Sequence, residues 1–197
     1  MAAEQRRFIE RLRRRDEAAF NELVRRHQQP VFRLLCSMLG DRAEAEDVAQ
    51  EVFVSVFKAI ESFRGDAQLS TWLYRVAVNH GKNRIKYLAR RARDAQRPLD
   101  ESVHGEPGDG APGVVGERPD APDHAVEGKQ AHVLMQRALA SLDEEQRTLV
   151  VLRDLQHLSY DEIQRVTELP IGTVKSRLHR ARVALQARYR ALSEGTP

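Results

Sequence analysis

The stretch "LPIGTVKSRLHRARVAL", residues 169–185, has side chains that suit binding to nucleic acid. Its apolar residues recur at helical spacing, and the charged residues between them are all basic. Lys and Arg contact phosphates and guanine edges when such a helix lies in a DNA major groove, and Ser and Thr also bond there. Taken alone, the stretch fits a solvated basic helix equally well. The residues expected to face outward are Thr173, Lys175, Ser176, Arg177, His179 and Arg180.

The residues just before this stretch favour the DNA interpretation. Ser159 and Glu162 match the S-x-x-E capping box that opens a helix. Pro170 and Gly172 make a tight turn plausible. A short helix over 159–168, a turn, and a second helix over 171–185 form a helix-turn-helix pattern, in which the second helix reads the major groove.

A second basic stretch is "TWLYRVAVNHGKNRIKYLARRAR", residues 71–93. From Arg75 onward it has seven basic residues and no acid, with aromatic and amide side chains interleaved. Cations and aromatic faces suit single-stranded nucleic acid, whose bases are free to stack on side chains. Trp72 and Val76 also have the spacing of core residues, and a solvated Asn79 needs no ligand, so both interpretations stay open.

A third stretch, "AEDVAQEVFVSVFKAI", has one polar helix face that contains an apolar residue. Asp47, Gln50, Glu51 and Val54 fall at i, i+3, i+4 and i+7. An apolar residue inside a charged stripe hints at a docking face for another protein. A solvated helix face explains the same pattern, and these residues by themselves favour it.

The sequence has no recognisable catalytic or metal-binding pattern. It lacks G-x-x-x-x-G-K, H-E-x-x-H and G-x-S-x-G, and its seven histidines are scattered. Cys36 is the single cysteine, so no internal disulfide forms, and its apolar surroundings fit a buried small hydrophobe. We expect no enzymatic activity, catalytic residue, metal, cofactor or small-molecule substrate.

Composition divides the chain into three parts. Residues 1–93 carry 19 basic and 12 acidic side chains, and residues 129–197 carry 11 and 8. Residues 94–128 carry 2 basic and 9 acidic side chains, five prolines and six glycines, too few apolar groups to offset the entropy of ordering. We predict an all-α protein, with two small helical domains joined by a flexible acidic linker. Without a signal peptide or a membrane-length apolar run, we expect it in the cytoplasm.

Capping residues mark several helix ends. Asp16 is a candidate cap for one helix, and Pro30 is expected to start or kink the next. Gly40 and Asp41 end that helix and cap the following one. The last helix of the first domain is expected from about Thr71 to the start of the linker.

Three motifs, in this order, resemble one bacterial family. They are "DVAQEVF" (47–53), "FRGDAQLSTWLYRVAVNHGKN" (63–83) and "LSYDEIQRVTELPIGTVKSRLHRAR" (158–182). Together they resemble the extracytoplasmic-function (group 4) sigma factors, most closely the sigma-E-like branch, over nearly the whole chain except the linker. The resemblance implies a sigma-2 domain, a sigma-4 domain with the helix-turn-helix, and a non-catalytic factor that directs core RNA polymerase to −10 and −35 promoter elements.

The resemblance also implies partners. These are the beta-prime clamp helices and the beta flap of core RNA polymerase, promoter DNA, and an anti-sigma factor, commonly membrane-bound, in a stress or envelope response. The resemblance also favours the docking interpretation of the third stretch. The residues that would contact polymerase are Asp47, Gln50, Glu51 and Val54.

Within the first domain, the resemblance makes the loop 63–70 a pocket for a base flipped out of the −10 non-template strand. The residues implied for this strand are Phe63, Arg64, Gly65, Asp66, Trp72, Arg75, Asn79, Lys82, Arg84 and Lys86. The outward face of the helix 171–185 would read the −35 element as duplex.

Two positions depart from the family pattern. Lys175 stands where arginine is also common, and His179 where an apolar or aromatic residue is often seen. Lysine cannot make the bidentate fork that arginine makes to guanine, so the −35 sequence stays open. Two rival functions remain. One is a helix-turn-helix regulator that acts alone, but such a regulator has no use for residues 63–83. The other is a sigma mimic that sequesters an anti-sigma factor, but such a mimic has no need of two basic helices.

Overall fold

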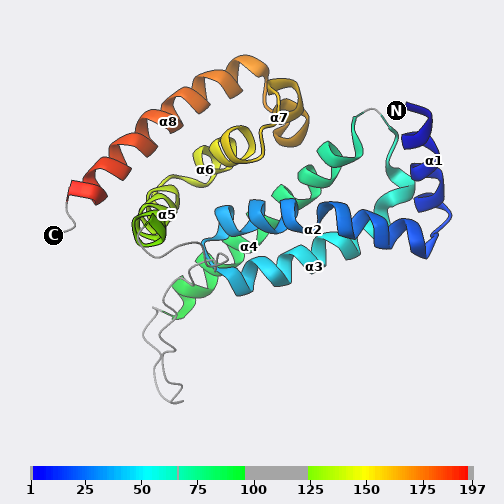
Figure 1. The fold of residues 1–197 in the computed structure, drawn as a ribbon, viewed down its shortest axis with the longest axis horizontal. Helices are drawn as coiled ribbons and strands as arrows, with labels where there is room; N and C mark the ends of the chain where they lie inside the picture. The colour runs from blue at the N-terminus through cyan, green and yellow to red at the C-terminus, as the bar shows by residue number, and fades with distance from the viewer. Residues whose placement is uncertain (1, 66, 96–123, 195–197) are drawn as a thin grey trace, which may run out of the picture.

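The computed structural model describes residues 2–65, 67–95 and 124–194, and all regular structure in these ranges is helical (Figure 1). This confirms the all-α prediction for the described residues. Most of the predicted linker, residues 96–123, and Asp66 lie outside them. In chain order the elements are α1 (Ala2–Arg13), α2 (Glu17–Leu39), α3 (Arg42–Ala59), the 3-10 turn η1 (Ile60–Ser62), α4 (Leu69–Ala95), α5 (His124–Ala140), α6 (Glu144–Val150), the π-helical turn η2 (Val151–Leu155), α7 (Tyr160–Thr167) and α8 (Ile171–Glu194).

Local capping explains where several of these helices begin and end. Gly40 ends α2 with φ +73°, a left-handed conformation that glycine adopts without strain. At the starts, a side-chain oxygen accepts from the backbone N–H three residues on, which satisfies a group that the helix leaves unpaired. The capping residues are Asp16 for α2, Asp41 for α3, Asp143 for α6 and Ser159 for α7, the last in a complete capping box with Glu162.

Pro30 does not start a helix. A single helix, α2, runs through it from Glu17 to Leu39. Proline removes one backbone hydrogen bond from a helix interior. Leu23 and Val31, on either side of it, are fully buried, so packing of both halves of α2 holds the helix in one piece.

Helices α2, α3 and α4 form the first bundle, with α1 at the end where α2 begins (Figure 1). Gly81 lets α4 come close to α2, because a Cβ there would lie 3.0 Å from the terminal methyl of Met38. The core of the bundle is made of fully or almost fully buried apolar side chains, among them Leu23, Leu34, Leu35, Val48, Val52 and Leu73.

Helix α8 packs against α5, α6 and α7 to form the second unit. Its core includes Leu139, Leu149, Ile163 and Leu178. The predicted helix-turn-helix is present as α7 and α8, with α8 extending to Glu194. Met135 of α5 has the spacing of an inward-facing residue beside Ala138 and Leu139, but it lies at the surface.

The two units pack against each other. Helix α7 lies on α4, and α5, α6 and η2 contact α2, so the buried residues of both units form one connected cluster. Arg147 of α6 links them: its guanidinium donates to the carbonyl of Met38 at 2.7 Å, and to those of Ala140 at 2.6 Å and Leu142 at 3.0 Å. Burial lowers the pKa of Arg147 and outweighs the charges of Glu144 and Asp143, which act to raise it.

Replacing Arg147 with methionine should destabilise the fold. The carbonyl groups of Met38, Ala140 and Leu142 would lose their donor, while the aliphatic volume is kept. We expect the free energy of unfolding to fall by about 2 kcal/mol in urea denaturation. The exposed Arg188, changed to methionine, is the matched control and should change it by less than about 0.5 kcal/mol. Equal effects of the two substitutions would contradict this role.

Cys36 is buried on α2, and burial raises the pKa of its thiol to about 11. The thiolate is the reactive form, so at pH 8 almost none is present in the folded chain. We expect Cys36 to react slowly with a thiol-specific chromogenic disulfide at pH 8, and rapidly once the chain is unfolded in urea. A fast reaction without denaturant would contradict the buried, unreactive state.

Candidate polymerase and nucleic-acid interfaces

One face of α3 is buried, and the opposite face is exposed to solvent. Val48, Val52 and Val56 point into the first bundle. The predicted docking residues Asp47, Gln50, Glu51 and Val54 are all exposed, and 51% of the surface of Val54 is open to solvent. A half-exposed valine flanked by acid and amide groups can contribute apolar area to an interface whose rim is polar.

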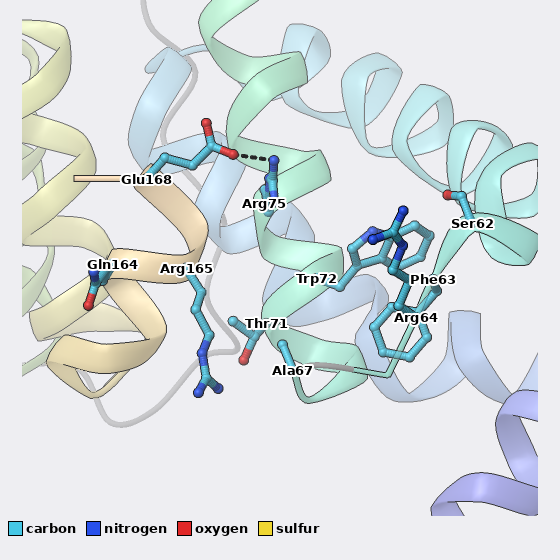
Figure 2. Close-up of a pocket in the computed structure, with 10 residues that line it drawn as sticks. All are labelled: Ser62, Phe63, Arg64, Ala67, Thr71, Trp72, Arg75, Gln164, Arg165 and Glu168. Atoms are coloured by element: carbon cyan, nitrogen blue, oxygen red, sulfur yellow. Dashed lines mark hydrogen bonds and ion pairs between the residues drawn. The ribbon is translucent and has the colours of Figure 1, made fainter. Parts of the chain in front are cut away.

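The loop before α4 borders a cavity of about 400 Å³ (Figure 2). Phe63 is buried at its wall, with its ring centre 5.2 Å from that of Trp72, and Arg64 lies beside them. Gly65 has φ +83°, a backbone conformation that other residues rarely adopt. Arg13 of α1 holds the loop by donating to the carbonyl of Phe63 at 2.5 Å.

Four of the predicted strand-binding residues share one stripe of α4. Arg75, Asn79, Lys82 and Lys86 fall at i, i+4, i+7 and i+11, and all are exposed or half-buried. The stripe spans about 16 Å along the helix, enough to follow several nucleotides. It begins next to Trp72, so the cavity and the basic stripe form one continuous surface.

Arg84 is placed differently from the rest of this set. Its guanidinium reaches α3, where it pairs with Glu44 at 2.5 Å and Glu51 at 2.7 Å, and its side chain is only 20% exposed. His80 Nδ1 lies 3.6 Å from Glu51 as well. The contact of Arg84 with strand phosphates stays a prediction, and it would require these ion pairs to open.

Helix α8 buries one face and presents the other. Val174, Leu178 and Ala181 are buried against the rest of the second unit. Of the predicted reading residues, Lys175, Ser176, His179 and Arg180 are exposed, and Thr173 and Arg177 are half-buried. The outward face therefore carries the polar and basic set, as a groove-binding helix requires.

Two reading residues already have neighbours in the second unit. Arg177 forms an ion pair with Glu145 of α6, and the Lys175 ammonium lies 5.5 Å from the ring centre of Tyr160. Both contacts are at the surface, where such interactions are weak. They orient the side chains without removing them from a ligand's reach.

Several residues that shape these surfaces were not predicted. Arg13 holds the loop at the cavity, and the opposite cavity wall has Gln164 and Arg165 from α7 and Glu168 from the turn that follows it. These residues lie far in sequence from the loop and α4, and nothing in their local pattern marks the contact. Arg13 lies in a run of arginines, where no one member stands out.

Comparison with protein families identifies both units. The family model of sigma-70 region 2 matches residues 23–93, and that of sigma-70 region 4 matches residues 132–185. The chain is 35% identical over 178 residues to the RNA polymerase sigma-H factor of Pseudomonas aeruginosa, covering 90% of each chain. It is 36% identical over 185 residues to the ECF RNA polymerase sigma-E factor of Escherichia coli, covering 94% of each.

The chain belongs to the extracytoplasmic-function sigma-70 family. It is therefore a sigma factor, a non-enzymatic subunit that directs RNA polymerase to promoters and binds DNA through its region 4 helix-turn-helix. The predicted family, function and absence of enzymatic activity are confirmed. The roles assigned to individual residues stay predictions.

Two solved structures share the fold of this sigma factor. One is the sigma factor RpoE from Bartonella quintana in complex with the anti-sigma factor NepR, with a TM-score of 0.64, 22% identity, and coverage of 87% of this chain and 96% of that one. The other is CnrH with the cytosolic domain of CnrY, with a TM-score of 0.65, 22% identity, and coverage of 98% and 99%. Among the described residues of this sigma factor, no helix has the length and apolar character to cross a membrane.

Proposed function

We propose that this sigma factor docks on core RNA polymerase through the exposed stripe of α3. At the beta-prime clamp helices the polar contacts are made by Asp47, Gln50 and Glu51. Val54, which lies on the same stripe, makes the apolar contact. The exposure of all four side chains supports this assignment. The second domain, residues 129–197, takes the beta flap as its partner.

The cavity beside α4 takes one base flipped from the non-template strand of the −10 element. Extruding a base from the stack costs a few kcal/mol, and stacking on Trp72, which Phe63 supports from behind, offsets part of that cost. Arg64 and Arg75 lie at the cavity, and Asn79, Lys82 and Lys86 continue along α4 to meet the strand that follows. Gly65 and Asp66 belong to the same loop.

The outward face of α8 reads the −35 element in the major groove. Lys175, Arg177 and Arg180 supply the positive charges, while Thr173, Ser176 and His179 supply hydrogen-bonding groups. Exposure of the basic set on the side of α8 opposite its buried face supports this assignment. Because lysine is a point charge, Lys175 suits a phosphate better than a guanine edge.

The acidic segment 94–128 joins the two proposed reading domains, 1–93 and 129–197; its ends belong to α4 and α5, and its middle lies outside the described residues. Such a tether lets one chain contact two promoter elements while polymerase fixes their spacing. The Bartonella quintana structure named above contains an anti-sigma factor, which supports anti-sigma control of this sigma factor too, in a stress or envelope response in the cytoplasm.

The observation that carries this function is the presence of three surfaces on one chain: the α3 stripe, the cavity that continues into the basic stripe of α4, and the outward face of α8. A helix-turn-helix regulator acting alone needs only the third. A sigma mimic needs neither basic surface.

The test is transcription by purified components. Transcripts mapped after overexpression give candidate promoters, and the purified chain with core polymerase should produce run-off transcripts from them. Arg177→Ala and Arg180→Ala should each lower the run-off yield from −35-dependent promoters by about fivefold or more, since each removes a contact to DNA. Arg188→Ala, near the other end of α8, should leave the yield unchanged.

Two results would overturn the proposal. Tight binding to promoter duplex without polymerase, combined with no run-off product, would indicate a regulator acting alone. Full activity of both Arg177→Ala and Arg180→Ala would remove the assignment of α8 as the −35 reader, while leaving the family membership untouched.

A further inference from the structure

Arg84 lies on the side of α4 that faces away from the proposed strand-binding stripe. Successive residues of an α-helix are rotated by about 100° around its axis, so Arg84 lies about 160° to 180° around α4 from Arg75, Lys82 and Lys86. Its guanidinium reaches across to α3 instead. A phosphate bound along the stripe would therefore lie on the other side of α4 from Arg84.

The guanidinium of Arg84 bridges two carboxylates of α3. Its Nη1 pairs with Glu44 at 2.5 Å, and its Nη2 pairs with Glu51 at 2.7 Å. Burial acts to lower the pKa of Arg84, but the charges of Glu44 and Glu51 and their hydrogen bonds outweigh it, and the pKa is raised. Because the planar fork of arginine donates in two directions at once, one side chain fixes both carboxylates.

The carboxylate of Glu51 is held by this bridge but is not covered by it. Oε1 of Glu51 accepts from Arg84, and Oε2 lies 3.6 Å from Nδ1 of His80. The Glu51 side chain is 52% exposed, and an ionised carboxylate can accept about four hydrogen bonds. Glu51 can therefore keep its bond to Arg84 and still meet a partner at the α3 stripe.

The charges of this cluster suit a partner with basic groups. Glu44, Asp47 and Glu51 fall at i, i+3 and i+7 on the outer side of α3, and three carboxylates against one guanidinium leave the cluster acidic. Without Arg84, the two paired carboxylates would repel each other and turn freely in solvent. A partner would then have to order the Glu51 side chain on docking, which costs conformational entropy.

We propose that Arg84 is a positioning residue for docking on core RNA polymerase: it holds the Glu51 carboxylate ready for a basic group of the partner and takes no direct part in binding the strand. This inference rests on the proposed docking role of Glu51. It gives the guanidinium a function that its position allows, because Arg84 faces α3 and not the stripe that begins at Arg75.

The test compares Arg84→Met, Glu51→Gln and the variant that carries both changes. Core polymerase is titrated into full-length sigma factor labelled at its N-terminal amine, and fluorescence anisotropy gives the affinity. Arg84→Met should lower the affinity for core polymerase about two- to fivefold, the range of a partly exposed ion pair. Glu51→Gln should lower it at least as much. The double variant should bind as Glu51→Gln does, because Arg84 acts through Glu51.

Arg91→Met is the matched control for the loss of charge. Arg91 lies two turns after Arg84 on the same side of α4, is exposed, and forms no ion pair or hydrogen bond within the part of the chain that the structure describes. Its replacement should leave the affinity for core polymerase unchanged. Urea denaturation checks that each variant is folded. If Arg84→Met is not, Arg84→Lys takes its place, since lysine keeps the charge but can pair fully with only one carboxylate.

Strand binding is measured on the assembled holoenzyme, with core polymerase saturated by each variant. A short fluorescein-labelled single strand of mixed sequence is the probe. Lys82→Met, which removes a charge from the proposed stripe, should lower the affinity for this strand. Arg84→Met should leave the strand affinity unchanged, which a general distortion of α4 would not do.

Three results would overturn the inference. They are unchanged core affinity in Arg84→Met, effects of Arg84→Met and Glu51→Gln that multiply in the double variant, and a loss of strand affinity in Arg84→Met as large as that in Lys82→Met. In each of these cases a lowered core affinity of Glu51→Gln would leave the proposed docking role of α3 standing. Unchanged core affinity in Glu51→Gln would remove Glu51 from the docking stripe itself, and with it both proposals for this residue.

Discussion

Every proposed contact with the −10 strand depends on where α4 is held. Its inner face packs against α2, with Gly81 close to Met38, and its outer face carries the basic stripe. Arg84 fixes its position relative to α3 by pairing with Glu44 and Glu51. Since Glu51 also belongs to the proposed polymerase stripe, one guanidinium joins the surface proposed to dock on polymerase to the surface proposed to meet the strand.

Ion pairs between an arginine and a carboxylate also occur on the other basic surfaces of this sigma factor. Arg75 meets Glu168, and Arg177 meets Glu145, each at the protein surface. A carboxylate satisfies an arginine in the absence of ligand, and a phosphate can replace it at little cost because exposed pairs are weak. These pairs thus keep the proposed DNA-contacting residues oriented when no DNA is bound.

Features determined by neighbouring residues could be predicted from the sequence. The capping box at Ser159 and the end of α2 at Gly40 depend on a few adjacent residues, and both were predicted correctly. A new helix starting at Pro30, one of the two outcomes predicted there, is not found, because α2 packs against the core on both sides of the proline. The site was predicted as a set of basic and aromatic residues. The sequence alone could not show that Glu44 and Glu51 hold Arg84, or that Glu168 reaches Arg75, since these pairs join residues far apart in the chain.

The two units are packed together in the structure, and the proposed reading of both promoter elements at once requires them to separate on polymerase. Energy transfer between dyes on Asn83→Cys of α4 and Asp161→Cys of α7, in a Cys36→Ser background, measures this directly. We predict high transfer efficiency in the free protein and a fall to near background when core polymerase and promoter DNA are added, because the promoter elements lie about 85 Å apart. High efficiency that persists in complexes actively producing run-off transcripts would contradict the account.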